Sequence, residues 1–126
     1  MDDRKHYSDG MKVRREVLGD SHVDRATSQQ TDFNAEFQDL ITRYAWGEIW
    51  MRPGLDRKTR SLITLGMMIA LNRPDELRLH LRAALRNSAT QDEIREVLLH
   101  SAIYCGVPAA NSAFHLADEV LAETKR

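Results

Sequence analysis

Apolar residues recur at spacings of three and four along most of this 126-residue chain, while alternating β-branched residues are almost absent. Spacings of three and four place side chains on one face of an α-helix, whereas a half-buried strand requires alternation. The pattern therefore predicts an all-α fold. A chain of this length fits one ordinary domain, so we expect residues 1–126 to form a single domain around one hydrophobic core.

About six helices are expected, two of them in the N-terminal half. The first covers about residues 8–18 and stops at Gly19. The segment "DSHVDRATSQQTD" is polar and aperiodic, so it is expected to be an extended connection that lies on the surface or on a neighbouring subunit. Thr31 or Asp32 can cap the second helix. The buried face expected for that helix consists of Phe33, Phe37, Leu40, Ile41 and Tyr44.

Four further helices are expected in the C-terminal half. Asp56 can cap "RKTRSLITLGMMIALN", which is apolar on almost every side after its first turn and is therefore expected in the core. Asn72 suits a left-handed turn and Pro74 the first turn of the next helix, so these two helices should form a hairpin. The stretch "TQDE", residues 90–93, reads as a capping box. The helix that it opens is expected to bury Ile94, Val97, Leu98, Ala102 and Ile103, and Gly106 with Pro108 separates it from the last helix.

Charge and cysteine content exclude several classes of protein. With 18 basic and 19 acidic residues, the chain carries no excess charge for gripping nucleic acid or an anionic membrane. The apolar stretch at residues 62–71 is too short to span a bilayer, and the first ten residues contain no apolar signal region. Cys105 is the single cysteine, which excludes an internal disulfide and a multi-cysteine zinc site. These features predict a soluble cytoplasmic protein.

Glu48 lies between two tryptophans in "GEIWMRPGLDRKTRSL". A carboxylate in the apolar setting of Trp46, Ile49 and Trp50 is suited to carrying a proton. The alternative is a helix-end glutamate exposed to water, which is the commoner arrangement because an unpaired glutamate is seldom buried. Both interpretations are compatible with the spacing.

Four basic residues crowd the turn that follows Glu48: Arg52, Arg57, Lys58 and Arg60. Guanidinium groups bind carboxylates through paired, charge-assisted hydrogen bonds, so this turn would suit a small dianion. A solvated basic first turn is the commoner arrangement for any one of these residues, and Arg57 and Lys58 are expected to follow it.

His80 lies four residues after Glu76 in "ELRLHLRAAL", so the two share a helical face. Such a pair can orient an imidazole for catalysis, and it can equally be a structural histidine held by a carboxylate. A metal site requires more ligands at short spacing, so none is expected. No constellation is evident around His6, His22 or His100, while His115 is expected at an interface or in a structural role.

Three stretches carry a resemblance to a known family: "WGEIWMRPGLDRKTRSL", "ELRLHLRAALRN" and "EIREVLLHSAIYCGVPAANSAFH". Over about residues 7–123 the chain closely resembles the carboxymuconolactone decarboxylase family. The wider family includes alkylhydroperoxidase D-like proteins, whose shared helix carries CxxCxxxH. Aligning His80 with that histidine places Arg73 and Glu76 at the two cysteine positions, so the thiol redox pair is absent here.

The resemblance implies an alkylhydroperoxidase D-like helical fold that assembles into trimers or hexamers, with active sites near subunit boundaries and no cofactor. It also implies a carboxy-lyase reaction, the conversion of 4-carboxymuconolactone to the β-ketoadipate (3-oxoadipate) enol-lactone. This step belongs to the protocatechuate branch of the β-ketoadipate pathway of aromatic hydrocarbon catabolism.

Specific residues match this implied chemistry. His80 would be the proton donor or oxyanion partner, and Glu48 would control proton delivery. The substrate-binding group would comprise Arg52, Arg60, Trp50 and Glu76, with either arginine on the substrate carboxylate or lactone oxygen. Two alternatives are open: a cofactor-free lyase or isomerase acting on another small carboxylated lactone, and a non-catalytic helical oligomerisation module.

Overall fold

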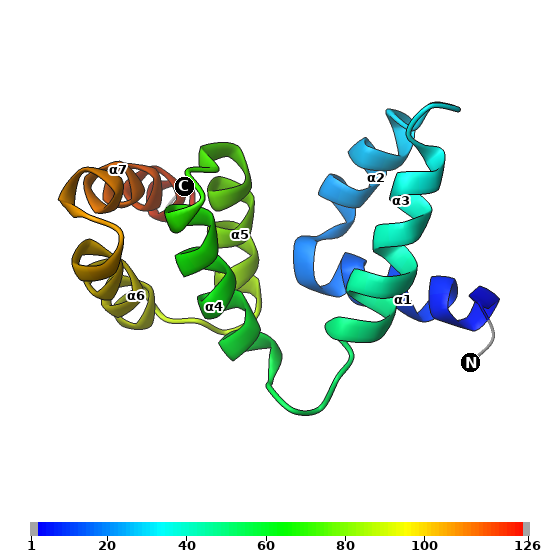
Figure 1. Cartoon of the computed structure of the whole chain (residues 1–126), viewed down its shortest axis with the longest axis horizontal. Coiled ribbons are helices and arrows are strands. Elements are labelled where there is room, and N and C mark those ends of the chain that lie inside the picture. The colour runs from blue at the N-terminus through cyan, green and yellow to red at the C-terminus, as the bar shows by residue number, and fades with distance from the viewer. Residues whose placement is uncertain (1–2, 125–126) are drawn as a thin grey trace. The chain divides into compact units, whose positions relative to one another are not determined.

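Residues 3–124 are described by the computed structural model, and throughout them the regular structure is helical (Figure 1). The predicted all-α class is therefore confirmed, with seven α-helices and one π-helical segment in this range where about six helices were expected. The chain divides into two compact units, Met1–Asp56 and Arg57–Arg126. Each unit is described by itself.

The N-terminal unit contains three α-helices and the π-helical segment. They are α1 (Asp3–Leu18), α2 (Asp20–Ser28), α3 (Ala35–Leu40) and η1 (Ile41–Ile49). Gly19 separates α1 from α2 at a φ of 92°, a left-handed value that glycine adopts without strain, so the predicted stop is confirmed. The start of α1 lies five residues before the predicted one, because polar residues continue the helix ahead of its apolar face.

Helix α2 corrects the prediction of an extended connection. The segment forms a nine-residue helix with Asp20 in its first turn and Arg25 in its last, charges that favour the helix dipole. Val23 is its one buried residue and is fully enclosed. One large apolar residue among polar ones produces no clear periodicity, which is why the sequence pattern did not reveal this helix.

The expected buried face of the second helix is also wrong. Phe33 is 97% exposed, and Phe37, Leu40 and Tyr44 are exposed as well. The side that packs within the unit instead contains the small residues Thr42 and Gly47. The apolar residues thus form an outer face that this unit leaves uncovered.

Helix α1 packs against η1 through two glycines. A Cβ atom at Gly10 would overlap the carbonyl oxygen of Thr42, and one at Gly47 would overlap the carbonyl oxygen of His6. The two backbones therefore touch where a larger residue would separate them. The buried guanidinium of Arg14 ties the same contact together, donating to Thr42 Oγ1 at 3.3 Å and to Gln38 Oε1 at 3.2 Å.

The C-terminal unit consists of α4 (Arg57–Ala70), α5 (Pro74–Arg86), α6 (Gln91–Tyr104) and α7 (Val107–Glu123). Asn72 has a φ of 57° and Pro74 lies in the first turn of α5, as predicted for the α4–α5 hairpin (Figure 1). Thr90 and Glu93 form the predicted capping box, each side chain bonding the other residue's backbone amide. Gly106, at a φ of 97°, is the N-cap of α7 and, as predicted, separates it from α6.

An apolar core joins the four helices of this unit. Fully buried leucines from three helices lie at its centre: Leu65 of α4, Leu81 of α5 and Leu98 of α6. The prediction that α4 belongs in the core is confirmed by Leu65 and Ile69, although its apolar residue Met67 is exposed, and Ile103 of α6 is exposed where burial was expected. One face of α4 and one face of α6 are therefore apolar and uncovered within the unit.

Within residues 3–124 no helix combines the length and apolarity needed to cross a membrane.

Candidate functional site

Glu48 lies at the C-terminal end of η1, between a histidine and an arginine. Its Oε2 is 3.3 Å from Nε2 of His6, and its Oε1 is 3.7 Å from Nη1 of Arg52. The side chain of Glu48 is 43% exposed and that of His6 only 12%. The carboxylate therefore faces water on one side and a largely buried imidazole on the other. This arrangement is intermediate between the two interpretations that the sequence left open, a carboxylate in an apolar setting and a glutamate exposed to water.

The two tryptophans next to Glu48 stack on each other. The rings of Trp46 and Trp50 are 5.0 Å apart between centroids and inclined by 29°. Trp46 is buried and Trp50 half-buried, and each lies two residues from Glu48 in the chain, so the segment that carries the carboxylate also carries an apolar surface. Glu48, Trp50 and Arg52 thus belong to one short segment of the N-terminal unit.

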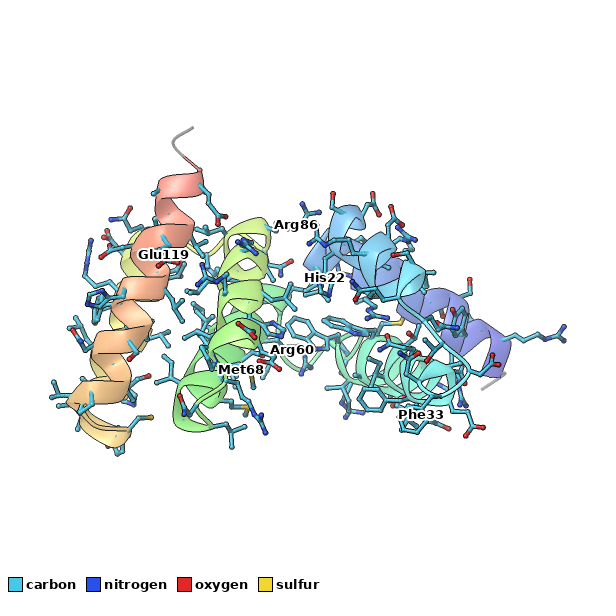
Figure 2. The ribbon with its side chains drawn as sticks, turned by 90° about the horizontal axis from the view of Figure 1, so that it is seen from above. His22, Phe33, Arg60, Met68, Arg86 and Glu119 are labelled. Carbon is cyan, nitrogen blue, oxygen red and sulfur yellow. The ribbon has the colours of Figure 1, made fainter. Side chains whose placement is uncertain are left out.

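The C-terminal unit carries the other predicted site residues. Arg60, labelled in Figure 2, is half-buried at the start of α4. The next residue, Ser61, accepts a 3.0 Å hydrogen bond from Nδ2 of Asn87, which fixes this turn against the C-terminal end of α5. On α5, His80 is half-buried, and Glu76 is exposed one turn earlier.

Sequence reasoning missed His6, which is 42 residues from Glu48 and shares no motif with it. Gly10 and Gly47, each inside a helical pattern, were the available signal. A glycine in such a position commonly marks a close backbone approach, and here it brings α1 onto η1. Pairing these two glycines from sequence alone would have required knowing which helices meet.

The remaining thiol and imidazoles have other surroundings. Cys105 is half-buried at the C-terminal end of α6, where the helix dipole disfavours a thiolate. Burial lowers the pKa of His22, and the nearby charges of Arg14 and Arg25 lower it further. His100 packs against Tyr104 with ring centroids 4.9 Å apart.

The chemistry available to these side chains is that of proton transfer and anion binding. A carboxylate flanked by an imidazole and a guanidinium can accept or return a proton, and arginines can hold a carboxylate or an oxyanion. In the part of the chain that the structure describes, no three His, Cys, Asp or Glu side chains are grouped as metal ligands.

The sequence model of the Carboxymuconolactone decarboxylase family matches residues 35–119. The chain therefore belongs to this family of helical proteins. It is 52% identical to 4-carboxymuconolactone decarboxylase of Acinetobacter baylyi over 120 residues, which are 95% of this chain and 90% of that one. It is also 49% identical to nitrosuccinic acid decarboxylase npaB of Metarhizium robertsii, over 87% of this chain and 77% of that one. A 4-carboxymuconolactone decarboxylase sequence of Pseudomonas putida is 56% identical over 48 residues, which are 38% of this chain and all of that one.

Proposed function

We propose that this protein is a carboxy-lyase that converts 4-carboxymuconolactone to the β-ketoadipate enol-lactone and carbon dioxide. The observation that carries the proposal is 52% identity to the Acinetobacter baylyi decarboxylase over nearly the whole of both chains. The family match runs across the boundary between the two units, which supports treating residues 1–126 as one catalytic domain.

The substrate itself makes the reaction possible without pyridoxal, thiamine or a metal ion. Its departing carboxylate is attached to a ring carbon next to the double bond that is conjugated with the lactone carbonyl, so the carbonyl can accept, through that double bond, the electron pair left by carbon dioxide. The protein then needs to hold the dianion, stabilise the developing oxyanion and return a proton to carbon.

The residues of both units are assigned to these tasks. Arg52 and Arg60 bind the substrate carboxylate or the lactone oxygen, and His80 donates the proton or stabilises the oxyanion. Glu48 controls proton delivery. Its pairing with Arg52 is long and exposed, and such pairs contribute only about 0–1 kcal/mol, so this pairing does little to hold the guanidinium away from a substrate carboxylate.

Two further groups complete the substrate-binding set. Trp50, stacked on Trp46, supplies an apolar wall that favours dispersal of the carboxylate charge. Glu76, one turn before His80 on α5, lies at the exposed end of the helix and can orient the imidazole when substrate is bound.

An assay with purified protein tests the proposal. After dialysis against a chelator, the enzyme should consume the muconolactone, followed by its absorbance, and should release carbon dioxide. Turnover that returns only when metal is added would contradict the cofactor-free mechanism. Turnover on another carboxylated lactone but not on this one would favour the related lyase or isomerase, and inactivity on all substrates would favour a non-catalytic module.

Nitrosuccinate is a second candidate substrate, favoured by the 49% identity to npaB. It is also a dianion, and a nitro group on the carbon that loses carbon dioxide can accept the electron pair as the lactone carbonyl does. The same arginines and proton donor would serve both reactions. The ratio of kcat/KM for the two substrates decides between them, because specificity is a difference in transition-state binding.

A closed homo-oligomer, trimeric or hexameric, is part of the proposal. Large apolar side chains are exposed in both units: Phe33, Phe37, Leu40 and Tyr44 in the first, and Leu99, Ile103, Tyr104 and Val107 in the second. An apolar groove between α4 and α6, lined by Leu62, Ile63, Val97 and Leu99, adds to this surface. Exposed apolar surface of this kind marks protein contacts. Light scattering that finds a monomer at micromolar concentration would contradict this assembly.

We place the enzyme in the cytoplasm, where a half-buried free thiol such as Cys105 stays reduced. Its expected role there is in protocatechuate degradation through the β-ketoadipate pathway. Fluorescence of a tagged chain in cells grown on protocatechuate tests this location.

A further inference from the structure

The contact between His6 and Glu48 in the N-terminal unit is not explained by the proposed reaction. Nε2 of His6 lies 3.3 Å from Oε2 of Glu48, and the imidazole is largely buried while the carboxylate is partly open to water. The partner of a proposed catalytic carboxylate is therefore held inside the unit, not on a free side chain at the surface.

The backbone around His6 is fixed by the glycine contact between α1 and η1. The carbonyl oxygen of His6 occupies the space that a Cβ atom of Gly47 would need, and Gly47 directly precedes Glu48. One turn along α1, Gly10 touches the backbone at Thr42 in the same way. His6 can hardly move relative to Glu48 unless these two helices separate.

The two nitrogens of His6 have different surroundings, and this assigns the ring proton. Nδ1 is buried and, among the residues that the structure describes, has no hydrogen-bond partner, whereas Nε2 faces the carboxylate. A proton on Nδ1 would be a buried donor without an acceptor, while a proton on Nε2 is donated to Glu48. Of the two neutral tautomers, the Nε2–H form is therefore favoured.

The other oxygen of Glu48 has a different kind of partner. Oε1 is 3.7 Å from the guanidinium of Arg52, whose side chain is 61% exposed, so this pairing is loose while the one to His6 is enclosed. Oε2 is thus anchored and Oε1 is left facing the open side, where a substrate proton would be exchanged.

We propose that His6 is a positioning residue, which donates its Nε2–H to Oε2 of Glu48 and holds the carboxylate with Oε1 directed to the substrate. The proposal rests on the proposed role of Glu48 in proton delivery. His6 itself touches no reacting atom. A misplaced proton carrier affects the chemical step more than ground-state binding, so loss of His6 should lower kcat and leave KM little changed.

The test compares His6→Ala with His6→Gln, whose amide N–H can replace the Nε2–H donor. His6→Ala should lower kcat by about 10- to 100-fold, the range for residues that orient metal ligands through a hydrogen bond. His6→Gln should recover most of that loss. His22→Ala, which removes another half-buried imidazole from the same unit, is the matched control and should retain wild-type kcat.

A double-mutant cycle with Glu48→Gln separates positioning from general destabilisation. If His6 acts through Glu48, adding His6→Ala to Glu48→Gln should lower kcat no further. Equal losses in both backgrounds, or wild-type kcat in folded His6→Ala, would overturn the proposal. Thermal unfolding of each variant establishes the folded fraction.

Imidazole nitrogen NMR tests the contact without any substrate. The His6 signals should show the Nε2–H tautomer in the wild type and shift in Glu48→Ala. If the His6 signals behave in this way while Glu48→Gln keeps full turnover, the proposed role of Glu48 in proton delivery is wrong, but the hydrogen bond from His6 to Glu48 is still established. Signals that do not respond to Glu48→Ala would sink the positioning role whatever the enzyme's substrate.

Discussion

The two units of this chain are held together in different ways. In the C-terminal unit, leucines such as Leu65, Leu81 and Leu98 interlock in a continuous apolar core. In the N-terminal unit, two backbones touch at Gly10 and Gly47, and polar side chains such as Arg14 lie buried beside them. An apolar core gains stability in proportion to the area it buries, whereas a backbone contact depends on the absence of side-chain atoms. The units should therefore respond differently to the same kind of substitution.

The largest effect is expected on turnover, and it tests whether catalysis depends on both units. Glu48→Ala in the first unit and His80→Ala in the second should each lower kcat by about 10²- to 10⁴-fold, the usual contribution of a positioned general acid or base. Cys105→Ser is the control and should leave kcat nearly unchanged. The measurement is kcat on the folded fraction, with thermal unfolding of each variant. Normal kcat in folded His80→Ala would remove this histidine from the mechanism.

The next effect concerns the apolar core. Leu81→Ala should lower the free energy of unfolding by about 2–5 kcal/mol, because the leucine is fully buried and its removal leaves a cavity. Leu81→Met preserves the volume and should cost less than about 1.5 kcal/mol. Urea unfolding monitored by circular dichroism gives both values, and similar losses for the two variants would argue against tight packing around this position.

A smaller effect with opposite signs is expected for two glycines. Gly10→Ala should destabilise the protein by about 1–3 kcal/mol, because the methyl group would overlap the Thr42 carbonyl and force α1 away from η1. Gly66→Ala, on α4 with open space around the added atom, should stabilise it by about 1 kcal/mol through helix propensity. Urea midpoints that rise for both variants would show that the helices of the N-terminal unit do not touch at Gly10.

The smallest effect is a pH dependence of the C-terminal unit. The hydrogen bond from the Thr90 amide, followed by that from Lys58, lowers the pKa of Glu93 below its ordinary value of 4.5. A carboxyl group whose pKa is lower in the folded state stabilises the fold above its unfolded pKa, and this contribution disappears as the pH falls through the folded one. Glu93→Gln keeps a capping side chain but does not titrate. The melting temperature of the wild type should therefore fall more than that of the variant on acidification from pH 6 to about pH 3; parallel curves would contradict the shift.

The same contrast explains how much of the fold could be predicted from the sequence. Helices α4 to α7 are bounded by residues whose local chemistry is unambiguous, such as Asn72, Pro74 and the Thr90 capping box, and these predictions are confirmed. In the N-terminal unit, α2 buries only the side chain of Val23, which is too little to give a sequence pattern. The apolar residues that begin with Phe33 were expected to be buried, but they lie on the exposed side of their helix. Periodicity identifies a buried face only where the unit itself covers that face.

The candidate site divides in a similar way. Trp46, Trp50 and Arg52 are close to Glu48 in sequence, so their grouping could be predicted. His80 could be singled out by its spacing from Glu76, and the family resemblance implied a role for it. The partner of Glu48 could not be predicted, because His6 is 42 residues away in sequence and comes close to Glu48 only through the packing of α1 on η1. The roles of His80, Glu48, Arg52 and Arg60 stay predictions until the variants are measured.

The π-helical segment gives the chain an unusual tolerance of deletion. The Trp50 amide bonds to the Ala45 carbonyl five residues back, so the segment contains more residues than an α-helix of the same extent. Loss of one exposed residue there, such as Tyr44, can be absorbed by a return to α-helical bonding, without turning the residues on either side. Loss of Arg82 from the regular helix α5 would instead rotate every following residue by about 100° and misalign the core. A chain lacking Tyr44 should therefore still fold, as thermal unfolding can show, while a chain lacking Arg82 should not.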